Sequence, residues 1–501
     1  MKQAGNTAFQ KLQSYGAFVT GGLLFLLVLW VKPFGLGPQA VKVLAVAVLM
    51  ILWWVTEAMP MPAVALLPLV LFPLFQIASI KEVASSYGDS IIFLFMGGFF
   101  IGLAIEKWNL HKRIALSIVR VTGTSGDRIV LGFILATGFL SMWLSNTATT
   151  MMMFPIAVSV IHVVKERQPG HARHDHFALS IMLSIAYASN FGGIATIIGT
   201  PPNVAFVGYI AERYQFQITF TDWLMIALPI SLLLLLSLYV VLTKFLYPSR
   251  MASDQLTQAL IREELKKLGP LATAERRVLY IFLFTALMWI FKDLLNILFE
   301  HPSIVSMAGK IKLDDTLIAM TGALLMFMVA SGQRGPGASK RLLEWSDTSR
   351  MAWGILLLFG GGIALASALE KEGLIRMIGE WIAGFSVSGG FILVLVITLL
   401  SLFLSEVMSN IAQVIVFSPV IAGIADAIGI HPLLLGIPMA LAASCASMLP
   451  MGTPPNAIVF ASGHIRLAHM LKAGLVMNLI ALVLITLFSW FLIPVLFPAL
   501  K

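Results

Sequence analysis

The pentapeptide Gly-Thr-Pro-Pro-Asn occurs twice in the chain, at Gly199–Asn203 and at Gly452–Asn456. A Ser-Asn pair precedes each copy, and the residues around the two pairs repeat at a constant offset of 264 positions, with no gap over nearly sixty positions. A chain that is built twice from the same parts and is rich in apolar residues is typical of transporters with internal repeats. In such proteins, helix-breaking polar clusters at matching places indicate where substrate and coupling ions bind.

Composition places the chain in a membrane. Of its 501 residues, 59% are hydrophobic and only 11% are charged, whereas soluble domains carry about 25% charged residues. Apolar runs of about 20 residues recur along the whole length, which predicts an all-helical, polytopic membrane protein. The net charge of +9 is interpreted as a loop bias that sets orientation, so no nucleic acid is expected as a partner. The single cysteine, Cys445, excludes an internal disulfide and a cysteine cluster for a metal.

The apolar runs predict about eleven spans and two re-entrant hairpins. The hairpins are expected at 128–163 and 390–427, because each stretch has room for two half-length helices and is interrupted by a Ser-Asn pair. The two GTPPN segments interrupt the spans expected at 177–212 and 432–462, and the sequence NFGG at 190–193 also interrupts the first of them. The remaining spans are expected at 16–36, 41–59, 61–79, 89–107, 222–247, 277–297, 315–332, 354–371 and 469–499, with amphipathic connectors at 110–121 and 373–386.

The distribution of basic residues supports this topology. If the N-terminus is cytoplasmic, 23 of the 33 Lys and Arg residues fall in segments that face the inside. An odd number of spans separates the matching points of the two halves. The two repeats are therefore expected to have inverted topology, with the first hairpin entering from the inside and the second from the outside.

The interrupted segments offer ligands for cations and for anions. The Pro-Pro pairs cannot continue a helix and leave upstream carbonyls free. Free carbonyls, hydroxyls and Asn amide oxygens suit a small dehydrated cation, whereas the helix N-termini after the hairpin tips present N–H groups to a carboxylate. Lys and Arg are absent from the sequences SNTATT, SNIAQ and GTPPN. A bound anion would thus be neutralised by bound cations or dipoles, which favours coupled uptake.

Several of these features also have a purely structural interpretation. An isolated SNT or GTPP would indicate only hydrogen bonding within the membrane, and the matched duplication favours function. Gly97-Gly98 and Gly360–Gly362 are interpreted as close helix packing. The histidines of the basic segment 171–176 are interpreted as a solvated loop. Glu406 is an acidic residue at membrane depth and hence a functional hypothesis, with which a structural hydrogen bond at the hairpin tip competes equally.

The motifs resemble those of the divalent-anion:sodium symporter family. The resemblance rests on SNT at a hairpin tip, GTPPN in a broken span and the phrase MLPMGTPPNAIVFASGHI, and it covers essentially the whole chain. It implies transport of di- or tricarboxylates with sodium by a homodimer. It also implies that each protomer has a fixed scaffold domain and a transport domain, which holds both hairpins and both broken spans and moves as an elevator. The segments FLFMGGFFIGLAIEKWNL and LLLFGGGIALASALEKEGL are similar to the sodium-coupled branch.

The resemblance divides the chain into domains. Scaffold helices are expected in 1–127, with the first repeat beginning near residue 41, and in 277–389. The transport domain is expected to comprise 128–221 and 390–465. Residues 222–247 and 466–501 would be the last helices of the two repeats, and 248–276 a cytoplasmic connector. The expected location is the plasma membrane, which is the inner membrane of a bacterium.

Carried onto matching positions, the resemblance assigns two sodium sites and one substrate site. The first sodium site would consist of Ser141, Ser145, Asn146 and Gly199, and the second of Ser405, Met408 through its backbone, Asn410 and Gly452. The substrate carboxylates would contact Ser145, Asn146, Thr147, Ser409 and Asn410, with Ile411, Thr200, Pro201, Thr453 and Pro454 lining the remainder. Many relatives have a Thr where this chain has Ile411, so one end of the site is less polar and the substrate rank order stays open.

The leading hypothesis is sodium-driven import of a C4-dicarboxylate such as succinate, malate or fumarate. Within the same family, the alternatives are a sodium-independent dicarboxylate exchanger and a citrate symporter. An intramembrane enzyme is not expected, because the sequence contains neither HExxH nor GxSxG. A channel fits less well than a transporter, because two inverted half-sites that close on one substrate fit alternating access.

Overall fold

The computed structural model shows an all-helical membrane protein. It describes residues 2–123, 125–167, 172–248, 255–300, 312–333, 339–383 and 390–497, and in this part of the chain extended pairing is limited to one bridge between Ala330 and Arg341. Seven of the described helices are long and apolar enough to cross a membrane, which confirms the polytopic class. These are α2 (Pro38–Val55), α6 (Ser90–Lys107), α12 (Phe220–Val240, continued by a π-helical turn to Leu246), α14 (Thr273–Phe299), α17 (Trp353–Lys371), α20 (Asn410–Ile428) and α23 (Leu467–Leu496).

The other helices are shorter or carry polar ends. The first of them, α1 (Lys2–Val31), is apolar from Gly16 onward. They continue with α3 (Met61–Val64), α4 (Leu67–Leu74), α5 (Ile80–Ser86), α7 (Leu110–Thr122), α8 (Gly126–Ser141), α9 (Asn146–Arg167), α10 (Ala172–Gly193), α11 (Pro201–Tyr214), α13 (Gln255–Lys267), α16 (Asp315–Met328), α18 (Leu374–Ala383), α19 (Gly390–Leu404), α21 (Pro432–Ala443) and α22 (Pro454–Phe460).

The order of elements repeats between the two halves. In the first half α6 and α7 are followed by the pair α8–α9, the broken pair α10–α11 and α12, and in the second half α17 and α18 are followed by α19–α20, α21–α22 and α23. Each Ser-Asn pair lies where the second helix of a hairpin begins, and each GTPPN segment lies where the second helix of a broken span begins. The helix breaks predicted from the sequence are therefore confirmed.

One predicted span differs in the structure. The stretch 61–79 does not form one regular helix but the short helices α3 and α4, with α5 following. Pro62 and Pro68 lie in the first turns of α3 and α4, and Pro73 lies inside α4. Because proline lacks an N–H group and its ring clashes with the preceding turn, closely spaced prolines prevent one continuous helix here.

The histidine segment also differs from its interpretation as a loop. His174 and His176 lie in the first turns of α10, and His171 lies outside the described residues. The His176 side chain is half-buried, and its ring centroid lies 5.8 Å from that of Tyr247. Among the described residues, no group of three or more His, Cys, Asp or Glu side chains is placed to hold a metal ion.

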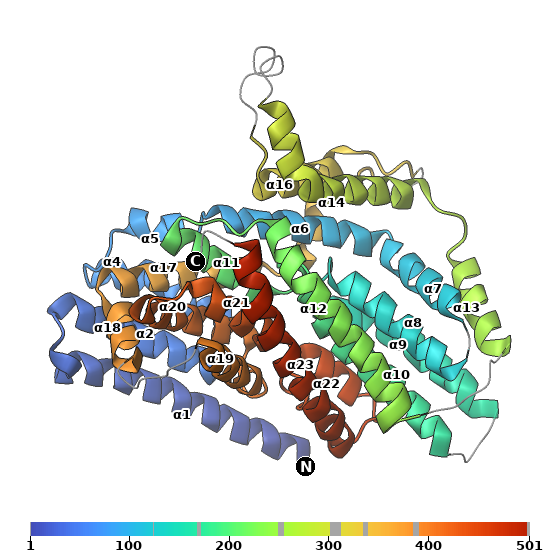
Figure 1. Ribbon diagram of the computed structural model, residues 1–501, viewed down its shortest axis with the longest axis horizontal. Coiled ribbons are helices and arrows are strands. Elements are labelled where there is room, and N and C mark those ends of the chain that lie inside the picture. Colours follow the sequence, from blue (N-terminus) through green and yellow to red (C-terminus); the bar gives the residue numbers. More distant parts are fainter. Residues whose placement is uncertain are drawn as a thin grey trace.

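The two halves are interlocked at the centre of the molecule. Figure 1 shows α2, α17, α18 and α20 at one end and α7, α8, α9 and α13 at the other, with α10, α12 and α23 running between them. Helix α11, which follows the break in the first half, packs against α20 of the second hairpin. Conversely, α22 of the second half packs against α9 and α10 of the first. Each hairpin is thus completed by the helix that follows the break in the other half.

Glycines allow helices from different parts of the chain to approach closely. A Cβ atom on Gly361 of α17 would lie 2.3 Å from the carbonyl oxygen of Ala65, and one on Gly97 of α6 would lie 2.7 Å from the carbonyl carbon of Ala319. A Cβ atom on Gly362 would lie 2.8 Å from a side-chain carbon of Ile415. These distances confirm the interpretation of the glycine pairs as close helix packing.

We expect Gly361→Ala to destabilise the protein, because the added methyl group would collide with backbone and overpacking costs about 1–3 kcal/mol. Gly22→Ala in α1 is the matched control, since nothing lies within 4 Å of a Cβ atom there. The measurement is the thermal unfolding midpoint of the purified proteins in detergent. Equal midpoints for the two variants would contradict the packing argument.

Candidate substrate and ion site

The first hairpin opens into a polar tip between α8 and α9. Ser141 at the end of α8 donates a hydrogen bond from its hydroxyl to Oδ1 of Asn146, the first residue of α9, at 2.7 Å. The hydroxyl of Ser145 accepts a hydrogen bond from the N–H of Ala148 at 3.2 Å, which caps the new helix. Ser141 is buried, Asn146 and Thr147 are half-buried and Ser145 is exposed. The tip therefore reaches from the surface into the protein.

The second hairpin has the same arrangement between α19 and α20. The buried hydroxyl of Ser405 lies 2.6 Å from Oδ1 of Asn410 and also within hydrogen-bond reach of the carbonyl oxygen of Ala443. Met408, Ser409, Asn410 and Ile411 are all half-buried, and the Ser409 side chain makes no capping bond. The Ser-to-Asn hydrogen bond is thus repeated at equivalent positions of the two halves.

The two broken spans also break with the same backbone conformation. Thr200 has φ −143° and ψ 137°, and Thr453 has φ −144° and ψ 150°. A residue before proline is forced out of the helical region, whereas proline itself is tolerated in the first turn of the next helix. Each Thr-Pro step therefore ends one segment and starts α11 or α22. Both threonines are buried, Pro201 is half-buried and Pro454 is exposed.

The asparagine that ends each GTPPN motif stabilises its own break. The amide nitrogen of Asn203 donates to the carbonyl oxygen of Thr196 at 2.9 Å, and that of Asn456 donates to the carbonyl oxygen of Leu449 at 3.1 Å. These two carbonyls occupy equivalent positions in the halves. The Oδ1 atoms of both asparagines are buried and find no donor among the described residues. Neither asparagine had a predicted role, although both end a repeated motif in the sequence.

Carbonyl and amide oxygens lie close to Gly199 and Gly193 in the first half. A Cβ atom on Gly199 would lie 2.3 Å from the carbonyl oxygen of Gly193 and 3.0 Å from that of Ser141, and one on Gly193 would lie 2.2 Å from Oδ1 of Asn146. The structure therefore brings together Ser141, Asn146 and Gly199 of the first predicted sodium site. Uncharged carbonyl and amide oxygens are the donors that a hard cation prefers.

In the second half, a carboxylate lies beside the break. Glu406 is 3% exposed, and a Cβ atom on Gly452 would lie 3.0 Å from its Oε2. Its carboxylate accepts hydrogen bonds from the N–H groups of Ser447 and Met448, at 2.8 Å each, and of Leu449, at 2.9 Å. The amide of Asn478 donates a fourth bond at 2.7 Å. These four donors support the structural interpretation of Glu406, because the carboxylate satisfies the backbone of the interrupted segment.

Asn190 joins polar groups of the two halves. Its side chain is fully buried, its Oδ1 accepts from Nδ2 of Asn146 at 3.4 Å, and its Nδ2 donates to Oγ1 of Thr453 at 3.1 Å. The first hairpin tip and the second broken span therefore belong to one hydrogen-bond network. Asn190 was not predicted as a site residue, although it begins the NFGG segment that interrupts the first broken span.

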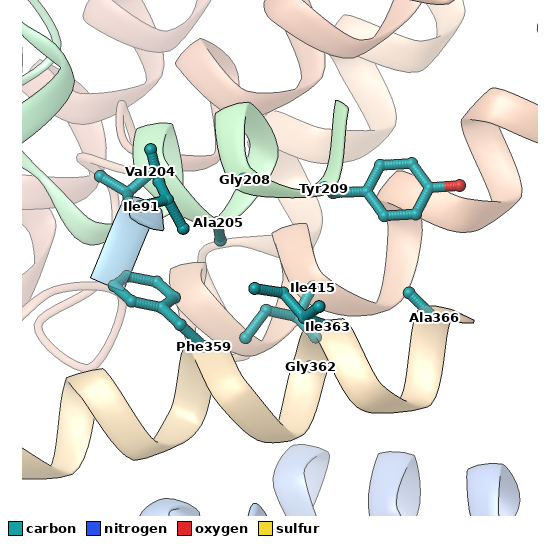
Figure 2. Close-up of a pocket in the computed structure, with 10 residues that line it drawn as sticks. All are labelled: Ile91, Val204, Ala205, Gly208, Tyr209, Phe359, Gly362, Ile363, Ala366 and Ile415. Atoms are coloured by element: carbon teal, nitrogen blue, oxygen red, sulfur yellow. The ribbon is translucent and has the colours of Figure 1, made fainter. Parts of the chain in front are cut away.

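An apolar cavity, lined by none of these polar side chains, lies where α6, α11, α17 and α20 meet. Its volume is about 20 Å³, which is close to the space of one water molecule. Figure 2 shows that its lining is apolar apart from the hydroxyl of Tyr209; the lining residues are Ile91, Val204, Ala205, Gly208, Tyr209, Phe359, Gly362, Ile363, Ala366 and Ile415. The cavity is too small and too apolar to hold a carboxylate.

The sequence and the fold of this chain are similar to those of known proteins. The chain matches the sodium:sulfate symporter transmembrane region over residues 16–497. The chain belongs to this family. Similar proteins include the sodium-dependent dicarboxylate transporter SdcS of Staphylococcus saprophyticus, which is 39% identical over 480 residues that cover 95% of this chain and 91% of that protein. SdcS of Staphylococcus aureus is 38% identical over 481 residues with the same coverage.

A solved structure supports the fold independently. The crystal structure of the YdaH transporter of Alcanivorax borkumensis superposes with a TM-score of 0.56 at 14% identity, over 82% of this chain and 87% of that one. The resemblance drawn from the motifs is confirmed by the family match, and the chain is a membrane transporter and not an enzyme.

We expect Glu406→Gln to lower the unfolding temperature and to reduce transport. The amide has a single acceptor oxygen and turns an NH2 group toward backbone donors, and each unsatisfied buried group costs about 1–3 kcal/mol. Glu380→Gln is the control, because Glu380 is exposed and pairs with Arg376 within α18. Thermal unfolding and uptake are measured on both. A Glu406→Gln protein with wild-type stability would contradict the role assigned to this carboxylate.

Proposed function

We propose that the chain is a sodium-coupled symporter that imports C4-dicarboxylates such as succinate, malate and fumarate. The observation that carries the proposal is the repeated hydrogen bond from Ser141 to Asn146 and from Ser405 to Asn410, with Asn190 joining the two halves. The relatives in both Staphylococcus species are named sodium-dependent dicarboxylate transporters, in agreement with the proposal.

The electrostatics of the tips favour coupling to cations. A dicarboxylate carries two negative charges, and the motif sequences contain no Lys or Arg to neutralise them. The N-termini of α9 and α20 supply partial positive charge, equivalent to roughly half an elementary charge each. The remaining charge is compensated by sodium ions bound to the oxygens around Gly199 in the first half and Gly452 in the second.

The proposed contacts follow the assignment made from the sequence. Sodium is held by Ser141, Ser145, Asn146 and Gly199, and by Ser405, Met408, Asn410 and Gly452. The substrate carboxylates are held by Ser145, Asn146, Thr147, Ser409 and Asn410, beside Ile411, Thr200, Pro201, Thr453 and Pro454. Ile411 is half-buried and packs partly against the apolar core, so it narrows the site without adding a hydrogen bond.

Transport proceeds by an elevator movement in this proposal. The two hairpins and the two broken spans, 128–221 and 390–465, move together as the transport domain, because α11 packs on α20 and α22 packs on α9. The scaffold comprises 1–127 and 277–389. Arg213 of α11 crosses the proposed boundary, since it contacts Glu370 of α17 at 2.7 Å and Asp426 of α20 at 2.6 Å. The proposed assembly is a homodimer in the plasma membrane, with cytoplasmic N-termini.

The test is succinate uptake into proteoliposomes that contain no substrate. An inward sodium gradient is expected to drive accumulation, and an inside-negative potential is expected to increase it if sodium charge exceeds substrate charge. Uptake that is independent of sodium and requires dicarboxylate inside the vesicles would contradict symport and indicate exchange. If citrate competes with succinate uptake more strongly than malate or fumarate does, the proposed substrates would be tricarboxylates and not C4-dicarboxylates.

We expect Asn146→Ala and Asn410→Ala each to lower sodium-dependent uptake by about tenfold or more, because each change removes an amide that is proposed to serve both a cation and a carboxylate. Ser159→Ala is the control, since this serine of α9 is exposed and, among the described residues, its hydroxyl bonds only to the carbonyl oxygen of Pro155 within its own helix. Membrane expression is measured in parallel with uptake. Wild-type rates in either asparagine variant would remove that asparagine from the proposed site.

A further inference from the structure

A basic pocket opens between α7 and α13. It has a volume of about 460 Å³ and is lined by Arg113, Ser117, Arg120, Arg262, Leu265 and Lys266. Figure 1 shows α13 beside α7 at the edge of the molecule. We propose that this pocket binds the phosphate headgroup of an anionic phospholipid.

The pocket follows from the periodicity of two facing helices. On α7, Arg113, Ser117 and Arg120 stand at positions i, i+4 and i+7, which share one face of a helix. On α13, Arg262 and Lys266 stand at i and i+4. The helices pack against each other, so both basic faces line one concave surface.

Among the described residues, one basic side chain of the pocket is already paired with a carboxylate, and the other three are not. Arg113 is bound to the buried carboxylate of Glu275, with its Nε 2.5 Å from Oε1, and to the carbonyl oxygens of Leu268 and Gly269. In contrast, Arg120, Arg262 and Lys266 are exposed and make no ion pair with any described residue. The neighbouring Glu263 and Glu264 are directed to Lys267 instead, at 3.3 and 2.8 Å.

Three unpaired cations that converge on one pocket repel each other unless an anion is bound. A phosphate group fits this demand, because guanidinium and ammonium groups form charge-assisted hydrogen bonds to its oxygens. The Ser117 hydroxyl is exposed on the same face and adds a further donor.

The apolar surroundings favour a lipid over a free phosphate ion. Val121, which directly follows Arg120, is 85% exposed. Leu271, two positions after the Gly269 carbonyl that holds Arg113, is 40% exposed. Aliphatic side chains left open beside basic ones are typical of a segment at the membrane surface, where acyl chains cover the apolar groups and anionic headgroups attract Lys and Arg.

Lipid binding in this pocket would link α13, which lies in the polar connector, to the first hairpin. Helix α13 packs not only against α7 but also against α9, the second helix of the first hairpin. An anion that bridges α7 and α13 therefore holds the connector close to a helix that carries a half-site, without taking part in the site itself.

The test is lipid retention by the purified full-length protein, followed by native mass spectrometry during titration with phosphatidylglycerol or phosphatidylcholine. We compare Arg120→Ala/Arg262→Ala/Lys266→Ala with the control Lys112→Ala/Arg276→Ala/Lys472→Ala, which removes the same charge from exposed residues outside the pocket. The pocket variant is expected to lose affinity for phosphatidylglycerol by about tenfold or more, whereas the control stays near wild type. Phosphatidylcholine binding is expected to be equal in the wild type, the pocket variant and the control variant.

A second variant tests the pocket independently, in case the triple mutant misfolds. Ser117→Glu places a carboxylate among the three cations and is expected to reduce phosphatidylglycerol binding with an unchanged or raised unfolding temperature. Equal losses in the pocket and control variants, or wild-type binding in the pocket variant and in Ser117→Glu, would overturn the proposal. Millimolar inorganic phosphate that displaces the lipid, or binds equally well without it, would reassign the pocket to a free anion.

Discussion

A helix that breaks inside a membrane exposes backbone groups that lipid cannot satisfy, and the centre of this molecule is organised around that constraint. Each break is repaired by side chains of the protein. Asn203 and Asn456 donate to the carbonyls upstream of their own motifs, and Glu406 accepts from three consecutive N–H groups. In the first half, the hydroxyl of Thr196 donates to the carbonyl oxygen of Met142 at 2.5 Å and accepts from the N–H of Gly199 at 3.0 Å. These four side chains stabilise the breaks, and none of them is among the residues proposed to bind substrate or sodium.

The sequence predicted the breaks well and the long-range partners poorly, for a physical reason. A Thr-Pro-Pro step or a Ser-Asn pair acts on the backbone next to it, so its effect is local and can be inferred from a short segment. The bond from Asn190 to Thr453 joins residues from opposite halves, and no local pattern specifies such a partner. The span predicted at 61–79 was wrong in form because apolar composition outweighed its prolines in the prediction. His176 was placed in a loop because charge alone does not distinguish a loop from a helix end.

The polar clusters around the two breaks share geometry but not charge. Glu406 stands next to Gly452, whereas the equivalent position in the first half is Met142, an uncharged residue whose backbone carbonyl accepts the hydrogen bond from Thr196. The pattern after each Ser-Asn pair differs as well, with Thr147 in the first half and Ile411 in the second. The cluster in the first half is therefore richer in hydroxyls, and the cluster in the second half lies beside a buried carboxylate that is held by four donors. An inverted repeat of this kind need not present two equal faces to a bound molecule.

The exchange of helices between the halves sets an order of events during synthesis. Helix α9 is completed against α22, and Asn146 is linked through Asn190 to Thr453, which follows roughly 300 residues later in the chain. At about 5–20 residues per second, the ribosome needs roughly 15–60 s to supply that partner. During this interval the first hairpin is in the cell without the helix that covers it. The first half of the chain is thus synthesised without its full set of packing partners. Its polar hairpin tip is shielded from lipid only after the second half has been made.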